Sequence, residues 1–178
     1  IAESKKRGIG ILMDLTLNHC SDQHRWFKAA RSSKDSPYHD YFLWRDGTPD
    51  CPPNEMRGVF GGLAWTYVPE IKQWYFHQCA PEQPDMNWEN PKLREELYDV
   101  MRFWVKKGVA GFRLDVVDQI AKEPDKNITI NGPRLHEYLH GISENVLTDE
   151  GLVTVGEAWG ADTERAKRYS APDGSELS

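Results

Sequence analysis

The sequence lacks the features that would place it in a membrane or on a nucleic acid. In its 178 residues no apolar run approaches the roughly 20 residues that a membrane-spanning helix needs. Lysine and arginine together number 22 against 28 aspartate and glutamate residues, for a net charge of −6. Because no surplus of cations is present to bind phosphates, we expect neither a nucleic-acid partner nor a membrane partner.

Cysteine is also scarce, and its pattern argues against a disulfide framework. The three cysteines, Cys20, Cys51 and Cys79, are odd in number and follow no metal-ligand spacing. A reduced, cytoplasmic protein with no metal site and no cofactor is the simplest interpretation. No methionine or signal peptide opens the chain, which starts at Ile1 as if inside a helix, so we expect the true N-terminus to lie elsewhere.

What the sequence does contain is an alternation of strand and helix patterns. Residues 9–15 form a nearly continuous apolar run, which is typical of a strand buried on both faces of a parallel sheet. Residues 109–117 and 151–157 are predicted as two further strands. A helix is expected to begin at Asn90-Pro91, where asparagine caps and proline suits the first position, and another covers about residues 133–147. This order predicts parallel pairing.

Residues 19–90 differ in character from the rest. They hold most of the prolines and show little periodicity beyond a short helix near Asp22–Ser32. A stretch of this length between regular elements is either functional or a small inserted domain. The chain also has seven Trp, seven Tyr and six Phe, which can stack on sugar rings or fill a core, so composition alone leaves both roles open.

Each predicted strand is followed or ended by an ionisable residue. Asp14 ends the first strand with His19 just beyond it, Asp115 lies near the end of the second, and Glu157 ends the third. Active sites of parallel α/β proteins collect at the carboxyl ends of strands, so three such residues in a row indicate a shared cleft. Arg113 and Asp115 project to the same face, where the guanidinium keeps the carboxylate ionised, as a nucleophile requires.

Glu157 is predicted to have the opposite environment. It shares a strand face with Val153 and Val155, and apolar surroundings should raise its pKa so that it holds a proton as a general acid. Two carboxyl groups about 5–5.5 Å apart with these roles hydrolyse a glycosidic bond with retention of configuration. The alternative, in which Arg113 and Asp115 form a buried ion pair and Glu157 caps a helix, stays open on spacing alone.

These residues also carry a family resemblance. Residues 14–19 (DLTLNH), 111–115 (GFRLD) and 156–159 (GEAW) resemble three signature segments of the α-amylase family of glycoside hydrolases, the second holding the nucleophile and the third the acid/base. Further segments are similar to the oligo-1,6-glucosidase subgroup of that family: residues 83–87 (QPDMN), 21–27 and 37–47.

The resemblance implies an α/β fold: a partial (β/α)8 TIM barrel with strands 3 to 5 and an inserted, irregular B domain. The expected boundaries are residues 1–19 for the strand 3 region, 20–88 for the B domain, and 89–178 for strands 4 and 5 with their helices. It also implies an α-glucosidase that cleaves short oligosaccharides, with α-1,6 bonds preferred. Catalysis would be a double displacement through a glucosyl-enzyme on Asp115, with Glu157 as acid/base.

The resemblance assigns roles to five other residues. His19 and Arg113 match family residues that contact the sugar in the −1 subsite, and Asp14 matches a carboxylate that lines the site or orients its neighbours. Phe60 resembles an aromatic of the B domain that closes this subsite, and Gln83 resembles a polar residue near the leaving group. A core aromatic and a structural glutamine are the alternatives for these two.

Three more positions bear on specificity and metal content. Val116 resembles the residue found in members that prefer α-1,6 bonds, although a valine also suits any strand end. Lys122 falls where the subgroup has a lysine in place of the calcium of true α-amylases; a solvated lysine is the alternative. Cys79 departs from the aromatic that relatives carry, which puts substrate preference in doubt.

Parts of the family pattern are missing, and rival functions remain. No aspartate after an Asn-His pair, the third family carboxylate, follows Glu157, and five of eight strands are absent, so we expect this piece neither to close nor to catalyse alone. Trehalose-6-phosphate hydrolase and sucrose isomerase are alternatives within the family. A non-catalytic barrel scaffold, or a metalloenzyme using His19, Asp14 and Glu157, is an alternative outside it.

Overall fold

The computed structural model describes residues 1–148, 151–170 and 175–177, which fold into two units. The first unit contains Ile1–Leu17, Pro91–Ala121 and Ile130–Ser178, and the second contains Asn18–Asn90 and Lys122–Thr129. The predicted boundaries did not anticipate that Lys122–Thr129 belongs to the second unit. Buried and surface ion pairs, Lys122 with Asp85 and Arg45 with Asp125, tie this short segment to the second unit.

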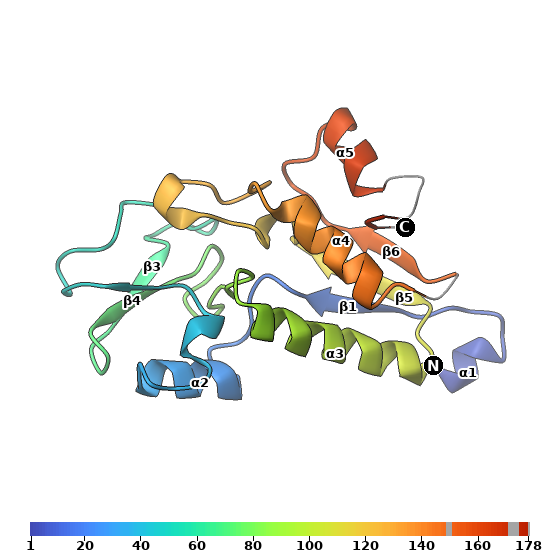
Figure 1. The fold of residues 1–178 in the computed structure, drawn as a ribbon, viewed down its shortest axis with the longest axis horizontal. Coiled ribbons are helices and arrows are strands. Elements are labelled where there is room, and N and C mark those ends of the chain that lie inside the picture. Colours follow the sequence, from blue (N-terminus) through green and yellow to red (C-terminus); the bar gives the residue numbers. More distant parts are fainter. Residues whose placement is uncertain (149–150, 171–174, 178) are drawn as a thin grey trace. The chain divides into compact units, whose positions relative to one another are not determined.

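The first unit is built on a parallel sheet with the strand order β1–β5–β6 (Figure 1). The prediction of parallel pairing is therefore confirmed. Its strands are β1 (Leu12–Thr16), β5 (Gly111–Asp115) and β6 (Val153–Gly156). Its helices are α1 (Ala2–Lys5), α3 (Pro91–Lys107), α4 (Leu135–Asn145), α5 (Thr163–Tyr169) and the 3₁₀ helix η2 (Val117–Gln119).

One face of this sheet carries the polar residues. Asp14 pairs with Arg113, and Arg113 pairs with Val155, so the three side chains form a row across the strands. In the row before it, Leu12 and Val153 are 41% and 48% exposed. The expectation that residues 9–15 are buried on both faces is wrong for this chain, because the side chains on this face of the described sheet reach solvent.

The opposite face forms the core of the first unit. Phe112 and Leu114 of β5 are fully buried, and helices α3 and α4 turn their apolar sides inward. Three- and four-residue spacing on each helix produces these sides, and Pro91 starts α3 as predicted. The buried residues are Leu93, Leu97 and Met101 in α3, and Leu135, Leu139 and Ile142 in α4.

The second unit is organised around aromatic side chains. Its antiparallel sheet has the order β2–β4–β3, and Phe27 of α2 stacks on Trp44 of β2 at 5.8 Å between ring centroids. Phe42 and Tyr75 meet Phe27 edge-on at 5.0 and 4.9 Å. Five of the seven tryptophans are buried in this unit and fill its core: Trp26, Trp44, Trp65, Trp74 and Trp88. The elements are α2 (Arg25–Ser32), β2 (Trp44–Asp46), β3 (Trp65–Val68), β4 (Gln73–Phe76) and the 3₁₀ helices η1 (His39–Tyr41) and η3 (Pro124–Lys126).

Two smaller expectations have structural outcomes. The short helix expected near Asp22–Ser32 begins later, at Arg25, because the His24 side chain accepts the Trp26 N–H at 3.3 Å and caps it. None of the helices in the described ranges combines the length and apolar character that spanning a bilayer requires.

Gly111 is a position of β5 that cannot carry a larger side chain. Its φ is +149°, and a Cβ there would overlap the carbonyl oxygen of Val153 on β6. We expect Gly111→Ala to lower the free energy of unfolding by about 3–5 kcal/mol, because the two backbones must separate. Gly8 has a φ of +70°, and no atom lies within 4 Å of a Cβ built there. Gly8→Ala should therefore lower the free energy of unfolding by only about 1–2 kcal/mol, the cost of the left-handed conformation. Urea unfolding measures both, and equal losses would contradict the close approach.

Candidate active site

The carboxylates at the ends of the first unit's strands are joined by one guanidinium. Nη1 of Arg113 donates to Asp115 Oδ1 at 2.7 Å and to Asp14 Oδ1 at 3.0 Å. Nη2 of Arg113 donates to Glu157 Oε2 at 2.7 Å. Because a guanidinium is a rigid planar fork, it holds carboxylates from three adjacent strands in one cluster. The hydrogen bonds to Asp115 and Asp14, in that order, also raise the pKa of Arg113 above its ordinary value.

The register of the sheet explains this convergence. Asp14 lies opposite Arg113 in the β1–β5 pair, and Asp115 ends β5 two residues later on the same face. The backbone of Glu157 continues the pairing one residue beyond β6. Its N–H donates to the Leu114 carbonyl at 2.9 Å, and its carbonyl accepts the Val117 N–H at 2.9 Å. The side chain of Glu157 is thereby delivered to the Asp115 end of the sheet.

Glu157 accepts hydrogen bonds on both carboxylate oxygens. The indole of Trp159 donates to Oε1 at 3.0 Å, and the Val116 N–H donates to Oε2 at 3.2 Å, beside Arg113. These contacts, with Trp159 first and Val116 second, lower the pKa of Glu157 below its ordinary value. The prediction of a raised pKa is wrong for this chain, because Val155 on the same face is 49% exposed and desolvation is outweighed by the donors.

Val116 has a strained backbone conformation next to Asp115. Its φ is +37° and its ψ is 47°, in the left-handed region that β-branched residues rarely adopt. Such a conformation costs about 1–3 kcal/mol and clusters at functional sites. Its own N–H donates to the Glu157 side chain at 3.2 Å, and the Val117 N–H that follows it donates to the Glu157 carbonyl at 2.9 Å, so the strained residue lies between two contacts with Glu157.

The cluster is accessible from solvent within the first unit. The side chains of Asp115 and Glu157 are 24% and 33% exposed, and that of Arg113 is 35% exposed. A small molecule can therefore reach the carboxylate oxygens. Asp14, at 69%, lies at the edge of the cluster and is joined to it by Arg113.

Three predicted site residues belong to the second unit. His19 is buried, and its ring nitrogens contact the side-chain amides of Asn18 at 3.2 Å and Gln83 at 3.0 Å. Phe60 is 74% exposed, so it is not a core aromatic. The structure thus brings His19 and Gln83 together in the second unit, and Asp14, Arg113, Asp115 and Glu157 together in the first.

Lys122 is buried rather than solvated. Its side chain is 1% exposed, and its Nζ lies 2.8 Å from Asp85 Oδ2 and 3.4 Å from the Asn18 carbonyl oxygen. Asp85 also accepts the Gln78 N–H at 2.9 Å. Burial lowers the pKa of Lys122, while the charge and hydrogen bond of Asp85 oppose this shift. An ammonium group therefore lies among oxygen atoms of the kind that bind a cation.

Side chains that could bind a metal ion are not clustered in the part of the chain that the structure describes. Within the described ranges, no group of three or more His, Cys, Asp or Glu side chains has a geometry suited to holding a metal ion. Asp14 and Glu157, two of the ligands that the metalloenzyme alternative would need, are instead bridged by Arg113.

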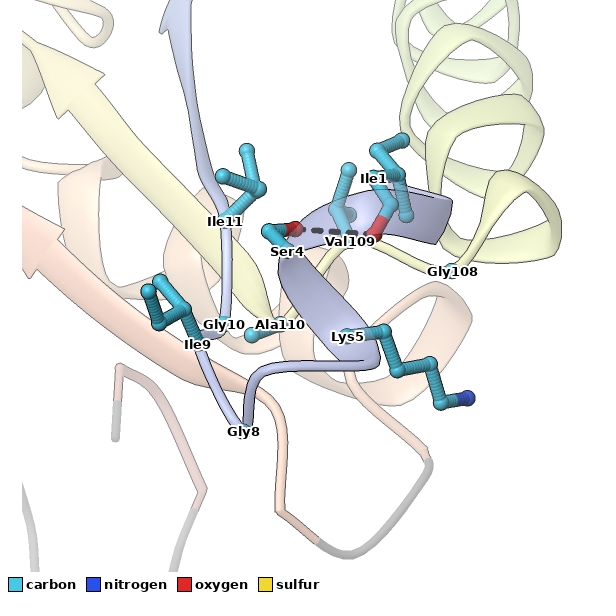
Figure 2. A pocket seen from close by; sticks show the side chains of 10 residues that line it. All are labelled: Ile1, Ser4, Lys5, Gly8, Ile9, Gly10, Ile11, Gly108, Val109 and Ala110. Carbon is cyan, nitrogen blue, oxygen red and sulfur yellow. Dashed lines mark hydrogen bonds between the residues drawn. The ribbon is translucent and has the colours of Figure 1, made fainter.

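A pocket at the other end of the sheet carries no comparable chemistry. Figure 2 shows it between α1 and the segments that precede β1 and β5. It has a volume of about 270 Å³, and only Lys5 among its lining residues is charged. Its lining side chains include Ile1, Ile9, Ile11 and Val109.

Sequence reasoning missed two residues around Glu157. Trp159 lies in the GEAW segment, and its place two residues after Glu157 is the signal that the sequence offers. Asp118 is fully buried and accepts the Gly160 N–H at 2.8 Å. In sequence it is one more polar residue in a turn, with no signal that distinguishes it.

The whole chain is similar to known proteins. A family model described as "Alpha amylase, catalytic domain" matches residues 1–178. Glucan 1,6-alpha-glucosidase of Streptococcus pneumoniae serotype 4 is 50% identical over 178 residues, which cover 100% of this chain and 32% of that protein. Trehalose-6-phosphate hydrolase of Escherichia coli strain K12 is 46% identical over 187 residues, covering 100% of this chain and 34% of that protein.

A solved structure is similar as well. The crystal structure of trehalose-6-phosphate hydrolase from Bacillus licheniformis superposes with a TM-score of 0.93 at 39% identity. The match covers 99% of this chain and 34% of that one. The chain therefore spans about a third of the length of the relatives that it matches.

The buried pair predicts a stability effect in the second unit. We expect Lys122→Met to lower the free energy of unfolding by about 3–5 kcal/mol, because it leaves the charge of Asp85 buried without its partner. Adding Asp85→Asn should restore part of this loss. Lys126→Met is the matched control: that lysine is 69% exposed, and its removal should change stability by about 0.5 kcal/mol or less. Chemical denaturation measures all three, and similar values for both lysines would contradict the argument.

Proposed function

The chain belongs to the α-amylase catalytic-domain family, and from this we propose that it is part of a retaining α-glucosidase acting on short oligosaccharides. The observation that carries the proposal is the bridge from Arg113 to Asp115 and Glu157 at the ends of adjacent parallel strands. Two carboxyl groups close enough to share one guanidinium are close enough to act on one glycosidic bond. The alternative of a buried ion pair with Glu157 as a helix cap fits less well, because both carboxylates are partly exposed and the Glu157 side chain accepts from Arg113 and Trp159.

We assign the first chemical step to both carboxyl groups. Asp115 attacks the anomeric carbon, and Glu157 in its protonated form gives its proton to the departing oxygen. The C–O bond to the leaving group breaks as the bond to Asp115 forms. The Arg113 guanidinium lies 2.7 Å from Asp115 Oδ1 and orients this carboxylate, which supplies the electron pair for attack.

The second step reverses the roles of the carboxyl groups. Glu157, now ionised, takes a proton from water, and the water oxygen attacks the anomeric carbon and releases Asp115. Two inversions give net retention. The donors around Glu157 favour its ionised form, which is the form required in this step.

The first step needs Glu157 in its protonated form, which the hydrogen-bond donors on the exposed sheet face disfavour. A site with less access to water would favour this form. We propose that β1, β5 and β6 are strands 3 to 5 of the family barrel and that the second unit is its B domain. Residues of the intact protein outside this chain would then cover Val155 and raise the pKa of Glu157 by desolvation. We also propose that the third family carboxylate lies outside this chain. The isolated segment would then be inactive.

The bond that is cleaved is a finer proposal. We favour α-1,6 bonds because Val116 follows the nucleophile and because a glucan 1,6-alpha-glucosidase is 50% identical to the chain. His19, Gln83 and Phe60 are proposed to bind the sugar. Trehalose-6-phosphate hydrolysis is the second candidate, because an enzyme of that name is 46% identical.

Substitution of the nucleophile tests the reaction in the intact protein. Asp115→Ala should lower kcat at least about 10⁴-fold on isomaltose, maltose, trehalose-6-phosphate and sucrose alike, because no covalent intermediate forms. The wild-type protein on the same panel identifies the preferred substrate. Asp99→Ala, which removes an exposed carboxylate of α3, is the control and should leave turnover unchanged. Substantial hydrolysis by the Asp115 variant would refute the assignment.

Azide distinguishes the two carboxyl roles by product stereochemistry. In Glu157→Ala, azide fills the space left by the side chain and attacks the glucosyl-enzyme, so α-glucosyl fluoride should give α-glucosyl azide. In Asp115→Ala, azide replaces the nucleophile and should give the β-azide after a single inversion. Proton NMR of the products reads the configuration, and exchanged outcomes would mean that the two roles are reversed.

A further inference from the structure

We propose that Asp118 and Asn131 are positioning residues, which clamp the Trp159–Gly160 turn so that the Trp159 indole orients the carboxyl group of Glu157. This inference rests on the proposed function, because it assumes that Glu157 is the acid/base. It concerns two residues that lie outside the motif segments and that act on Glu157 through Trp159.

Asp118 holds one side of the turn. It is fully buried in η2, and its Oδ2 accepts the Gly160 N–H at 2.8 Å. Its own carbonyl accepts the Asn131 N–H at 2.8 Å, so the two members of the clamp are joined. Burial raises the pKa of Asp118, while the Gly160 N–H opposes this shift. A carboxyl group buried at such a cost, with a backbone N–H as its partner, indicates a defined role for that contact.

Asn131 holds the other side. Its Nδ2 donates to the Gly160 carbonyl at 3.1 Å, and its Oδ1 accepts the hydroxyl of Tyr169 from α5. Both backbone groups of Gly160 are thus bound, the N–H by Asp118 and the carbonyl by Asn131. A Cβ on Gly160 would overlap Asn131 Nδ2 and lie 2.7 Å from Ile130 Cδ1, so glycine allows this approach.

Trp159 connects the clamp to Glu157. It lies between Gly160 and the backbone-bonded Glu157, and its Nε1 donates to Glu157 Oε1 at 3.0 Å. The Trp159 side chain is 54% exposed, so packing alone does not fix it. Because the backbone is held on both sides, the indole is kept where it can donate to the carboxylate.

A general acid is recognised by its dependence on the leaving group. A natural glucoside needs the proton of Glu157 when its bond breaks, whereas fluoride leaves from α-glucosyl fluoride with little help. A variant that only weakens folding or sugar binding should affect both substrates alike. The ratio of the two kcat/KM values therefore reports on Glu157 and separates a positioning role from a structural one.

The test uses the intact protein with single substitutions around the turn. Trp159→Phe, Asp118→Ala and Asn131→Gly should each lower kcat/KM on isomaltose about 10-fold or more, because a hydrogen bond to a charged group is lost or misplaced. On α-glucosyl fluoride the losses should be under about 3-fold by the same argument. Asp118→Asn keeps an oxygen for the Gly160 N–H and should retain most activity. Tyr98→Phe, a buried substitution in α3, is the control and should leave the ratio unchanged.

The pH profile gives a second readout. The charged groups that bear on Glu157 are Arg113 and Asp115 from β5, Asp14 through Arg113, and Asp118 from η2. Loss of the Trp159 donor destabilises the ionised carboxylate, so the basic limb of kcat/KM should move to higher pH.

The outcomes separate this inference from the proposed function. Suppose that Asp115→Ala is inactive, but that the turn variants lower kcat/KM equally on both substrates and leave the basic limb of the pH profile in place. The positioning role is then wrong, and the proposed function stands. If Asp115→Ala stays active on isomaltose, the proposed function itself fails. An Asp118→Asn variant as impaired as Asp118→Ala would also contradict the clamp.

Discussion

The first unit depends on one interaction, the bridge that the Arg113 guanidinium makes to carboxylates from three adjacent strands. Without it, Asp14, Asp115 and Glu157 would place like charges at one edge of a sheet, where repulsion destabilises the fold. A planar fork with several donors can satisfy such a set at defined angles, which a lysine cannot. The same contacts that neutralise the cluster also orient it, so stability and chemical competence have a common origin.

The sheet around this bridge has one buried face and one solvent-exposed face. The α3 and α4 side of the sheet buries Phe112 and Leu114, while the side with the carboxylates leaves Val155 half exposed. Hydrogen-bond donors therefore dominate the environment of Glu157 and favour its ionised form. A double displacement needs Glu157 first protonated and then ionised. Covering the exposed face of the sheet would favour the protonated form and so make both forms accessible.

The second unit is stabilised by different interactions from the first. It lacks long helices within its described residues, and it gains its stability from interlocked rings such as Phe27, Trp44 and Tyr75 and from the buried pair of Lys122 with Asp85. That pair places an ammonium group next to a buried carboxylate, so the chain itself balances the charge at this position. The return of Lys122–Thr129 to this unit is a consequence of that pair and of Arg45 with Asp125.

The sequence by itself determined the order β1, α3, β5, α4 and β6 and the carboxylates at the strand ends, because periodicity, the Pro91 helix start and strand-end residues such as Asp115 act locally along the chain. It did not predict the antiparallel sheet of the second unit, whose short strands show little periodicity. It did not determine the pKa of Glu157, the burial of Lys122 or the part that Trp159 and Asp118 play. Those properties depend on which groups from distant segments meet and on how much water they exclude. Only the tertiary structure decides the burial and the hydrogen bonding of these side chains, because their neighbours lie up to 104 residues away along the chain.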